Sequence, residues 1–256
     1  MKQRQLKLLG RIIIGSLLFF GNQIIWSAEA FGKSDPPPKN PRVIIIFVDM
    51  SGSTGQARGT VYKEGFEKVY QDIREGDRVV VGAITGRSYI DFKPTVDEII
   101  PKKTVWDNRI QSERKLTNSR EKIRSGVNRL LARKQGSSLT EILDSLNIAD
   151  TIFHDEKERQ KILVIFSDML QDSKEYNFEK DKITEEYINK VITYRQKNNL
   201  VPNLSGVKVY VAGASAANSE RFRGVQTFWA RYFAKSGADF SSHRYGHSLI
   251  SFENGP

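Results

Sequence analysis

The 256-residue chain contains no cysteine. This absence excludes disulfide bonds, zinc–thiolate sites, thiol nucleophiles and an anchor made by a lipid-modified cysteine. Apolar residues, by contrast, are plentiful at 39% of the chain, and 10% of the residues are aromatic, which is too much hydrophobic material for a disordered protein. The length allows one large domain or two small ones with a sizeable core.

Acidic residues are in the minority. Lysine and arginine number 40 against 30 aspartates and glutamates, so the formal net charge is +10. Such a surplus fits acidic partners, anionic lipid or nucleic acid without choosing among them. Segment 102–134 alone contains 11 bases and 3 acids. It is either a solvated helix face or an electropositive rim that steers an acidic partner. No RNA- or DNA-binding motif is recognisable, so nucleic acid is not expected as a partner.

The first 30 residues have the pattern of a bacterial signal peptide. Four bases, the last of them Arg11, precede a mostly apolar segment, 12–26. Ala28-Glu29-Ala30 then supplies a small-x-small cleavage pattern. The apolar segment is shorter than the roughly 20 residues of a membrane-spanning helix. We therefore expect residues 1–30 to be removed on export to the periplasm or the cell exterior. The alternative is that residues 12–26 are retained as an anchor in the inner membrane. A proline-rich linker, 31–41, follows.

Short apolar runs alternate with helical patterns over the remaining residues, 42–256. The runs are rich in β-branched residues and, apart from Lys208 in the last of them, uninterrupted by polar residues, which is typical of strands buried on both faces of a parallel sheet. They are Val43–Val48, Val79–Ile84, Ile162–Phe166 and Val207–Ala212. Apolar residues at 3.6-residue spacing lie between and after them and predict amphipathic helices. The sequence therefore predicts one α/β domain with a doubly wound, mostly parallel sheet flanked by helices, a Rossmann-like arrangement in which ligands bind beyond the carboxyl ends of the strands.

Oxygen-bearing side chains follow the ends of these predicted strands. Asp49, Ser51 and Ser53 come directly after the first run, and Asp168 follows the run that ends at Phe166. The loop 136–140 adds further hydroxyls just before a predicted helix. Because all of these groups are hard oxygen ligands, they suit Mg²⁺, Mn²⁺ or Ca²⁺ and not a soft metal. A turn with a helix N-cap is the simpler interpretation of segment 49–53 taken alone.

Together these residues resemble the metal-ion-dependent adhesion site of von Willebrand factor A domains. The D-x-S-x-S motif of that family is intact as Asp49, Ser51 and Ser53, and it follows an apolar strand as the family requires. The aspartate of the family's third loop matches Asp168. The resemblance covers about residues 43–252 and implies the same doubly wound fold.

Two positions depart from the family pattern. Ser137 stands where the family has a threonine in its second loop, as a replacement that keeps the hydroxyl, and Thr140 is the alternative if the register differs. Met169 stands where the family usually has a glycine, so the shape of the third loop is not set by the resemblance.

The resemblance implies a binding module and not an enzyme. Ser51 and Ser53 would bind a divalent cation directly, while Asp49 and Asp168 would act largely through waters, and the cation would then accept a carboxylate from a protein partner. Mg²⁺ is the expected cation, with Mn²⁺ or Ca²⁺ as alternatives. The expected metal-binding residues are Asp49, Ser51, Ser53, Ser137 and Asp168. A membrane is expected as a partner only if the N-terminal segment is retained.

Two other functions stay open at this point. Gly213–Ala217 follows a predicted strand and loosely resembles the nucleophile elbow of serine hydrolases, which would make Ser215 the nucleophile. Asp239 and then His243 or His247 follow in the hydrolase order, but the last glycine of the elbow is missing. The other alternative is an anchored scaffold whose metal loops are vestigial.

Overall fold

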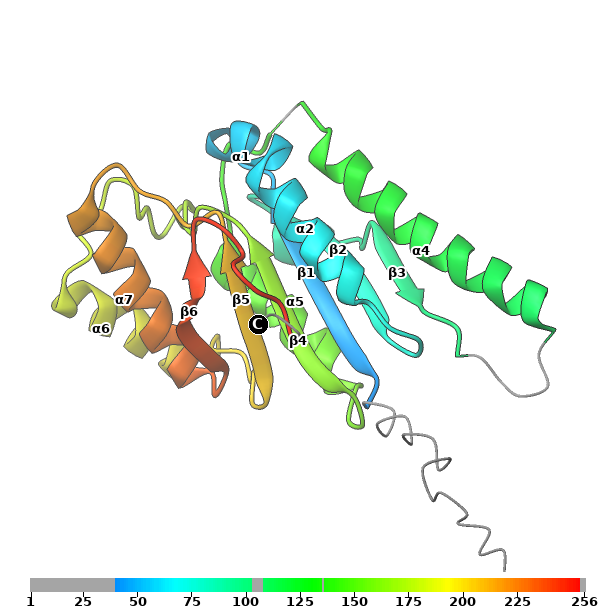
Figure 1. Ribbon diagram of the computed structural model, residues 1–256. Helices are drawn as coiled ribbons and strands as arrows, with labels where there is room; N and C mark the ends of the chain where they lie inside the picture. Colours follow the sequence, from blue (N-terminus) through cyan, green and yellow to red (C-terminus); the bar gives the residue numbers. More distant parts are fainter. Residues whose placement is uncertain (1–39, 103–107, 135, 254–256) are drawn as a thin grey trace, which may run out of the picture. The chain divides into compact units, whose positions relative to one another are not determined.

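The computed structural model describes residues 40–102, 108–134 and 136–253. The expected signal peptide and residues 31–39 of the expected linker lie outside the described residues. Within them, six strands form a sheet in the order β3-β2-β1-β4-β5-β6 (Figure 1). All neighbouring strands are parallel except β3, which is antiparallel to β2. The strands are β1 (Arg42–Asp49), β2 (Arg78–Ile84), β3 (Val96–Ile99), β4 (Gln160–Phe166), β5 (Val207–Ala212) and β6 (Asp239–Gly246).

Helices cover both faces of this sheet (Figure 1). Alternate residues of the central strand β1 point to opposite faces: Val43, Ile45 and Phe47 pack with α5, α6 and α7, while Ile44 and Ile46 pack with α2 and α4. The helices are α1 (Gly55–Gly59), α2 (Val61–Asp72), α3 (Ser88–Asp91), α4 (Arg109–Leu131), α5 (Ile142–His154), α6 (Glu185–Lys197) and α7 (Ser219–Lys235), with a 3₁₀ turn, η2 (Gly52–Thr54), before α1. The predicted doubly wound α/β fold is confirmed.

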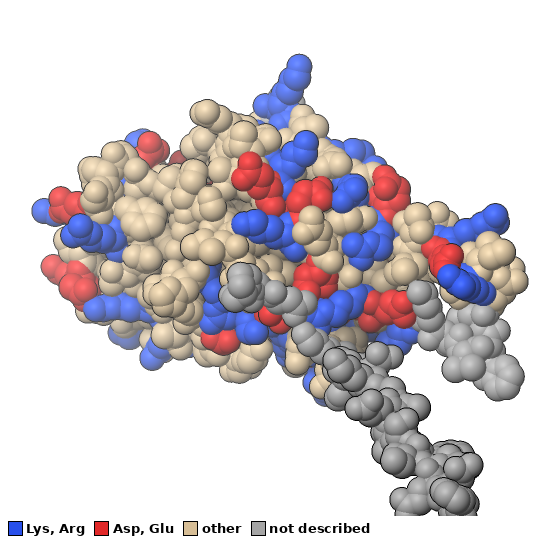
Figure 2. All heavy atoms as spheres, viewed as in Figure 1, with Lys and Arg blue, Asp and Glu red and all other residues tan. Residues whose placement is uncertain are grey.

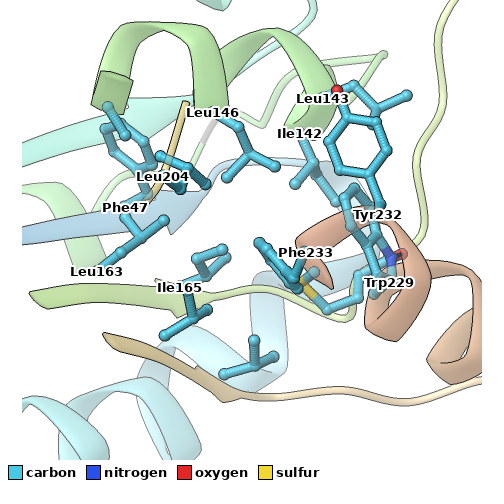
Figure 3. Close-up of a cluster of buried hydrophobic side chains, with 14 of the residues drawn as sticks. Phe47, Ile142, Leu143, Leu146, Leu163, Ile165, Leu204, Trp229, Tyr232 and Phe233 are labelled. Atoms are coloured by element: carbon cyan, nitrogen blue, oxygen red, sulfur yellow. Dashed lines mark hydrogen bonds between the residues drawn. The ribbon is translucent and has the colours of Figure 1, made fainter. Parts of the chain in front are cut away.

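The core on the α5–α7 face fixes the loop that follows β4. Phe47 and Ile165 of the sheet pack with Leu146 of α5 and Trp229 of α7, all of them fully buried (Figure 3). The indole N–H of Trp229 donates a hydrogen bond to the main-chain oxygen of Met169 at 2.9 Å. The residue next to Asp168 is therefore bonded to Trp229, which packs in an aromatic cluster with Phe228, Tyr232 and Phe233 of α7.

Residues Arg109–Leu131 of the basic segment form α4, with Ile123, Val127 and Leu130 buried against the sheet. Much of its charge is used within the domain. Arg124 pairs with Glu67 of α2 at 2.8 Å, and Lys122 pairs with a glutamate of β3. In Figure 2, basic and acidic side chains accordingly alternate over α2 and α4. Among the described residues, no helix is both long enough and apolar enough to cross a membrane.

Candidate metal site

The first loop of the candidate site begins where the central strand ends. Asp49 is the last residue of β1 and has no exposed surface. Its Oδ1 accepts a hydrogen bond from the main-chain N–H of Ser51 at 2.7 Å, and its Oδ2 accepts one from the hydroxyl of Ser167 at 2.6 Å. The carboxylate is therefore fixed by neutral donors from two neighbouring strand ends, β1 and β4.

A chain of hydroxyl and carboxylate groups joins the first loop to the third. The hydroxyl oxygens of Ser51 and Ser53 lie 3.0 Å apart, and the Ser53 hydroxyl donates to Oδ2 of Asp168 at 2.8 Å. The other oxygen of Asp168 accepts from the main-chain N–H of Leu170 at 3.0 Å. The structure thus brings Asp168 together with Asp49, Ser51 and Ser53 at the carboxyl end of the sheet, although Asp168 is 115 residues from Ser53 in the chain.

The second loop lies against the first through its backbone. The N–H of Ser137 donates to the oxygen of Met50 at 2.6 Å, and the N–H of Gly52 donates to the oxygen of Ser137 at 3.3 Å. A Cβ at Gly136 would meet the oxygen of Met50 at 2.8 Å and the nitrogen of Gly52 at 3.0 Å. Both contacts involve backbone atoms, so this close approach requires a glycine.

The hydroxyl of Ser137 is used differently from those of Ser51 and Ser53. It accepts hydrogen bonds from the N–H of Gly86 at 2.9 Å and of Leu139 at 3.4 Å. Thr140, the alternative ligand, is buried, and its backbone pairs with Asp172. The structure therefore places Ser137 next to the D-x-S-x-S motif, and its role as a metal ligand stays a prediction.

The third loop makes its turn with a residue that rarely adopts such a conformation. Met169 has a φ of 66°, in the left-handed region that favours glycine, and its side chain is fully buried. Its N–H donates to the hydroxyl of Ser167 at 2.9 Å, and its oxygen accepts from Trp229. These contacts hold the unfavourable backbone conformation in place and fix the direction of Asp168.

Both carboxyl groups of the site have a raised pKa, so their ionised forms are disfavoured. Burial and the charges of Asp49 and Glu179 raise the pKa of Asp168 to about 6, although the hydrogen bonds from Leu170 and Ser53 act in the opposite direction. Burial also raises the pKa of Asp49, although the hydrogen bonds from Ser167 and Ser51 act in the opposite direction. Adding a positive charge beside these groups would remove the cost of ionising them together.

Arg58 of α1 is the buried cation nearest in sequence to the motif, and sequence reasoning missed it. It is 4% exposed, and its guanidinium donates to the main-chain oxygen of Ser51 at 2.9 Å and to the hydroxyl of Thr54 at 2.8 Å. Its charge lowers the pKa of Asp49 as a minor contribution. Because its hydrogen bonds go to neutral oxygens, Arg58 supports the loop without neutralising a carboxylate.

The available donors fit a hard divalent cation. In the part of the chain that the structure describes, no three histidine, aspartate or glutamate side chains gather into a group that could hold a metal. A cation at this edge would therefore use the hydroxyl oxygens of Ser51 and Ser53 together with the two carboxylates, which is the oxygen-only donor set preferred by Mg²⁺ and Mn²⁺.

The residues of the serine-hydrolase alternative lie apart. Ser215 follows the carboxyl end of β5, where its N–H donates to the oxygen of Asp168 at 3.3 Å. Asp239 pairs with Lys208 at the opposite end of β5, and its carboxylate forms an ion pair with Arg244. A nucleophile and its orienting acid must be linked by a base within hydrogen-bond reach of both, so this arrangement disfavours a Ser215 triad with Asp239.

Comparison with known proteins yields structures and no sequence relatives. No protein-family model matches the chain, and no curated protein matches it. A von Willebrand factor type A protein from Catenulispora acidiphila matches 77% of this chain with a TM-score of 0.40 and 15% identity, and 42% of that protein is covered. The chain is similar in fold to a von Willebrand factor A domain.

Two further solved structures are similar at the same level. BatB from Bacteroides thetaiotaomicron matches 67% of this chain at 14% identity and a TM-score of 0.35, with 66% of BatB covered. The manganese-loaded TRAP protein of Plasmodium vivax matches 73% at 11% identity and a TM-score of 0.40, with 62% of TRAP covered. The chain thus spans less than two thirds of each of these three proteins. The likeness concerns the fold alone, and function has to be argued from the site.

Proposed function

We propose that this domain is a binding module that holds a divalent cation, Mg²⁺ or Mn²⁺, at the carboxyl edge of its sheet. The proposal rests on one observation: the buried carboxyl group of Asp168 accepts from the hydroxyl of Ser53, that of Asp49 accepts from the N–H of Ser51, and among the described residues all their hydrogen bonds come from neutral groups. Buried charges in proteins are paired or coordinate metals. Here the hydroxyls supply neutral ligands and the carboxyl groups supply the balancing charge.

The same chemistry favours a carboxylate of a protein partner as the bound group. A cation held partly by neutral hydroxyl oxygens keeps more of its positive charge than one surrounded by carboxylates, so it attracts a further anionic oxygen. Asp168 would orient the hydroxyl of Ser53, Asp49 would hold the first loop through the N–H of Ser51, and no group of the site needs to transfer a proton or break a bond. The activity is therefore binding and not catalysis.

A thermal unfolding experiment tests the metal site. The purified chain is melted in Mg²⁺, in Mn²⁺ and in EDTA. A cation present at 100 times its Kd stabilises the folded state by about 2.7 kcal/mol, which raises the Tm of a domain of this size by roughly 5–10 °C. Asp49→Ala and Ser53→Ala should lose this shift. Asp239→Asn, which changes a carboxylate at the opposite edge of the sheet, should keep it. Equal Tm values in Mn²⁺ and EDTA for the unaltered chain would contradict the proposal.

The proposed site of action is outside the cytoplasm. This part of the proposal rests on the charge, length and Ala28-Glu29-Ala30 pattern of the N-terminal segment. N-terminal sequencing of the protein recovered from the cell envelope should give Phe31 as the first residue. An intact Met1 would instead indicate that residues 12–26 are retained as an inner-membrane anchor.

A further inference from the structure

A pocket of about 830 Å³ lies directly beside the candidate metal site. Its lining includes Met50, which lies between two site residues, and Ser137, whose backbone pairs with the same loop. Leu139 and Ile90 add apolar surface from the second loop and from α3. A partner group bound at the cation would therefore have this pocket next to it.

The helix α3 presents apolar side chains to solvent at this place. Ile90 is 75% exposed and its neighbour Tyr89 is 64% exposed. Leaving such side chains in water is unfavourable, and covering Ile90 with an apolar group of a partner would gain free energy in proportion to the area buried. The exposed Ile90 is thus a suitable contact for an apolar side chain.

The position of Ile90 is fixed by the fold. The hydroxyl of Ser88 accepts from the N–H of Thr85 at 2.8 Å and donates to its oxygen at 2.9 Å. Arg87 and Asp91 form an ion pair at 2.9 Å across the turn of α3. These local bonds hold α3 at the carboxyl end of β2 with Ile90 facing outward.

Further bonds tie α3 to the loops of the metal site. The N–H of Gly86 donates to the hydroxyl of Ser137 at 2.9 Å, and the N–H of Glu141 donates to the oxygen of Thr85 at 3.1 Å. The hydroxyl of Ser137 thus links the segment between β2 and α3 to the second loop, which lies against Ser51. The pocket and the candidate metal site are therefore joined by the same hydrogen bonds.

The charges of the lining favour an acidic ligand. Three bases and two acids line the pocket. Arg87 is already paired with Asp91, which leaves Arg133 and Lys174 facing a single further acid, Glu141. Burial, together with smaller effects of nearby charges, raises the pKa of Glu141. The lining therefore carries a net positive charge beside its apolar surface.

We propose that this pocket binds an apolar side chain of the same protein segment whose carboxylate is held at the metal site. The ligand is then an exposed, extended stretch of a partner protein in which an aspartate or glutamate has an aliphatic or aromatic residue a few positions away. This inference rests on the proposed function, and it adds Ile90 and Arg133 as residues that determine which acidic segments bind.

Selection from a random-peptide phage library tests the inference without a known partner. The chain is immobilised in Mn²⁺, and bound phage are eluted with EDTA. We expect the eluted peptides to be enriched in an acidic residue with a Leu, Ile or Phe close by. The best peptide, measured as a synthetic ligand, should bind Ile90→Asp at least about tenfold more weakly, because the apolar contact is lost and a negative charge is added.

Matched variants separate the pocket from the metal site. Ile250→Asp changes another isoleucine, 80% exposed and outside the pocket lining, and should bind the peptide as the unaltered chain does. Asp49→Ala should lose peptide binding altogether. Ile90→Asp should keep the full Mn²⁺ shift in Tm, which shows that its fold and its metal site are intact.

The outcomes that contradict the inference differ from those that contradict the proposed function. EDTA-eluted peptides that share an acidic residue but no apolar neighbour, or equal binding by Ile90→Asp, would overturn the pocket assignment alone. Failure to recover any EDTA-sensitive peptide from a chain that shows the Mn²⁺ shift would overturn both the carboxylate ligand and the pocket. Absence of the Mn²⁺ shift would overturn the metal site itself.

Discussion

The central strand β1 has a buried charged residue at each end, and the two ends are completed in different ways. Arg42 begins the strand and Asp49 ends it, and neither side chain is exposed. The guanidinium of Arg42 bonds to the carboxylates of Asp77 and Asp72, with Nε–Oδ2 and Nη1–Oδ2 distances of 3.1 Å and 2.5 Å. In the described residues, Asp49 forms no ion pair with a lysine, arginine or histidine, and its hydrogen bonds come from neutral donors.

The pKa values reflect this difference. At Arg42 burial favours loss of the proton, but the hydrogen bonds and charges of Asp77 and Asp72 outweigh it and raise the pKa above the usual value. At Asp49 burial prevails and raises the pKa, so the charged form is disfavoured. The amino end of β1 is thus a structural ion pair network, whereas at the carboxyl end the charge of the buried Arg58 lowers the pKa of Asp49 only slightly and forms no ion pair with it. A buried anion of this kind indicates a binding site, and a completed network indicates a structural role.

The largest expected effect comes from breaking the completed end. Arg42→Met removes the buried cation from Asp77, which is 1% exposed, while Asp72 keeps its ion pair with Arg74. Removing one partner of a buried ion pair costs about 3–5 kcal/mol. Urea denaturation should show a loss of this size, with the Mn²⁺ shift preserved if the chain still folds.

Arg74→Met is the control for this end of the strand. Arg74 also pairs with Asp72, but its side chain is 26% exposed, and partly solvated pairs contribute roughly 0–1 kcal/mol. A loss for Arg42→Met no larger than that for Arg74→Met would show that the buried network is not the stabilising feature inferred here.

A change of intermediate size in the free energy of unfolding, with opposite signs in two buffers, is expected at Asp49, the carboxyl end of β1. Asp49→Asn removes a disfavoured buried charge and keeps an oxygen that can accept the bond from Ser51. In EDTA near neutral pH the free energy of unfolding of the variant should equal that of the unaltered chain or exceed it by about 1 kcal/mol. In Mn²⁺ at 100 times the Kd of the unaltered chain, it should be less stable by about 2–3 kcal/mol, because it no longer binds the cation.

Urea denaturation in the two buffers measures both differences. Greater stability of the unaltered chain by the same amount in EDTA and in Mn²⁺ would mean that Asp49 is a structural residue like Arg42, and that the two ends of β1 do not differ as inferred.

The sequence predicts the interior of this fold better than its edges. Strands β1, β2, β4 and β5 are mostly apolar because both of their faces are largely buried. The edge strands β3 and β6, with sequences VDEI and DFSSHRYG, are short or largely polar and partly exposed. The composition of these two segments is typical of loops, and they form strands only because a neighbouring strand pairs with them. The four-residue helix α3 likewise has no repeating pattern by which to recognise it.

The same distinction applies to the candidate site. The sequence places Asp49, Ser51, Ser53 and Asp168 correctly at one edge, since their positions follow from where buried strands end. It does not identify the supporting groups. The bond from Ser167 to Asp49 depends on the packing of β4 beside β1. The burial of Arg58 depends on where α1 folds back on the first loop. Neither residue has a sequence signal beyond its nearness to the motif.

The smallest expected effect concerns two hydroxyls of the second loop, those of Ser137 and Thr140, and it tests which of them belongs to the carboxyl end of β1. Ser137→Ala removes the acceptor for the N–H of Gly86, and a lost hydrogen bond of this kind costs about 1 kcal/mol. The Mn²⁺ shift in Tm should also decrease, either because a ligand is lost or because the second loop moves away from Ser51. Thr140→Val should leave the Mn²⁺ shift unchanged, since the backbone pairing with Asp172 is kept. Both variants are measured by thermal unfolding with and without Mn²⁺. A reduced shift in Thr140→Val together with a full shift in Ser137→Ala would reverse the assignment and make Thr140 the second-loop ligand, since Ser137 would then serve only to join α3 to the metal loops.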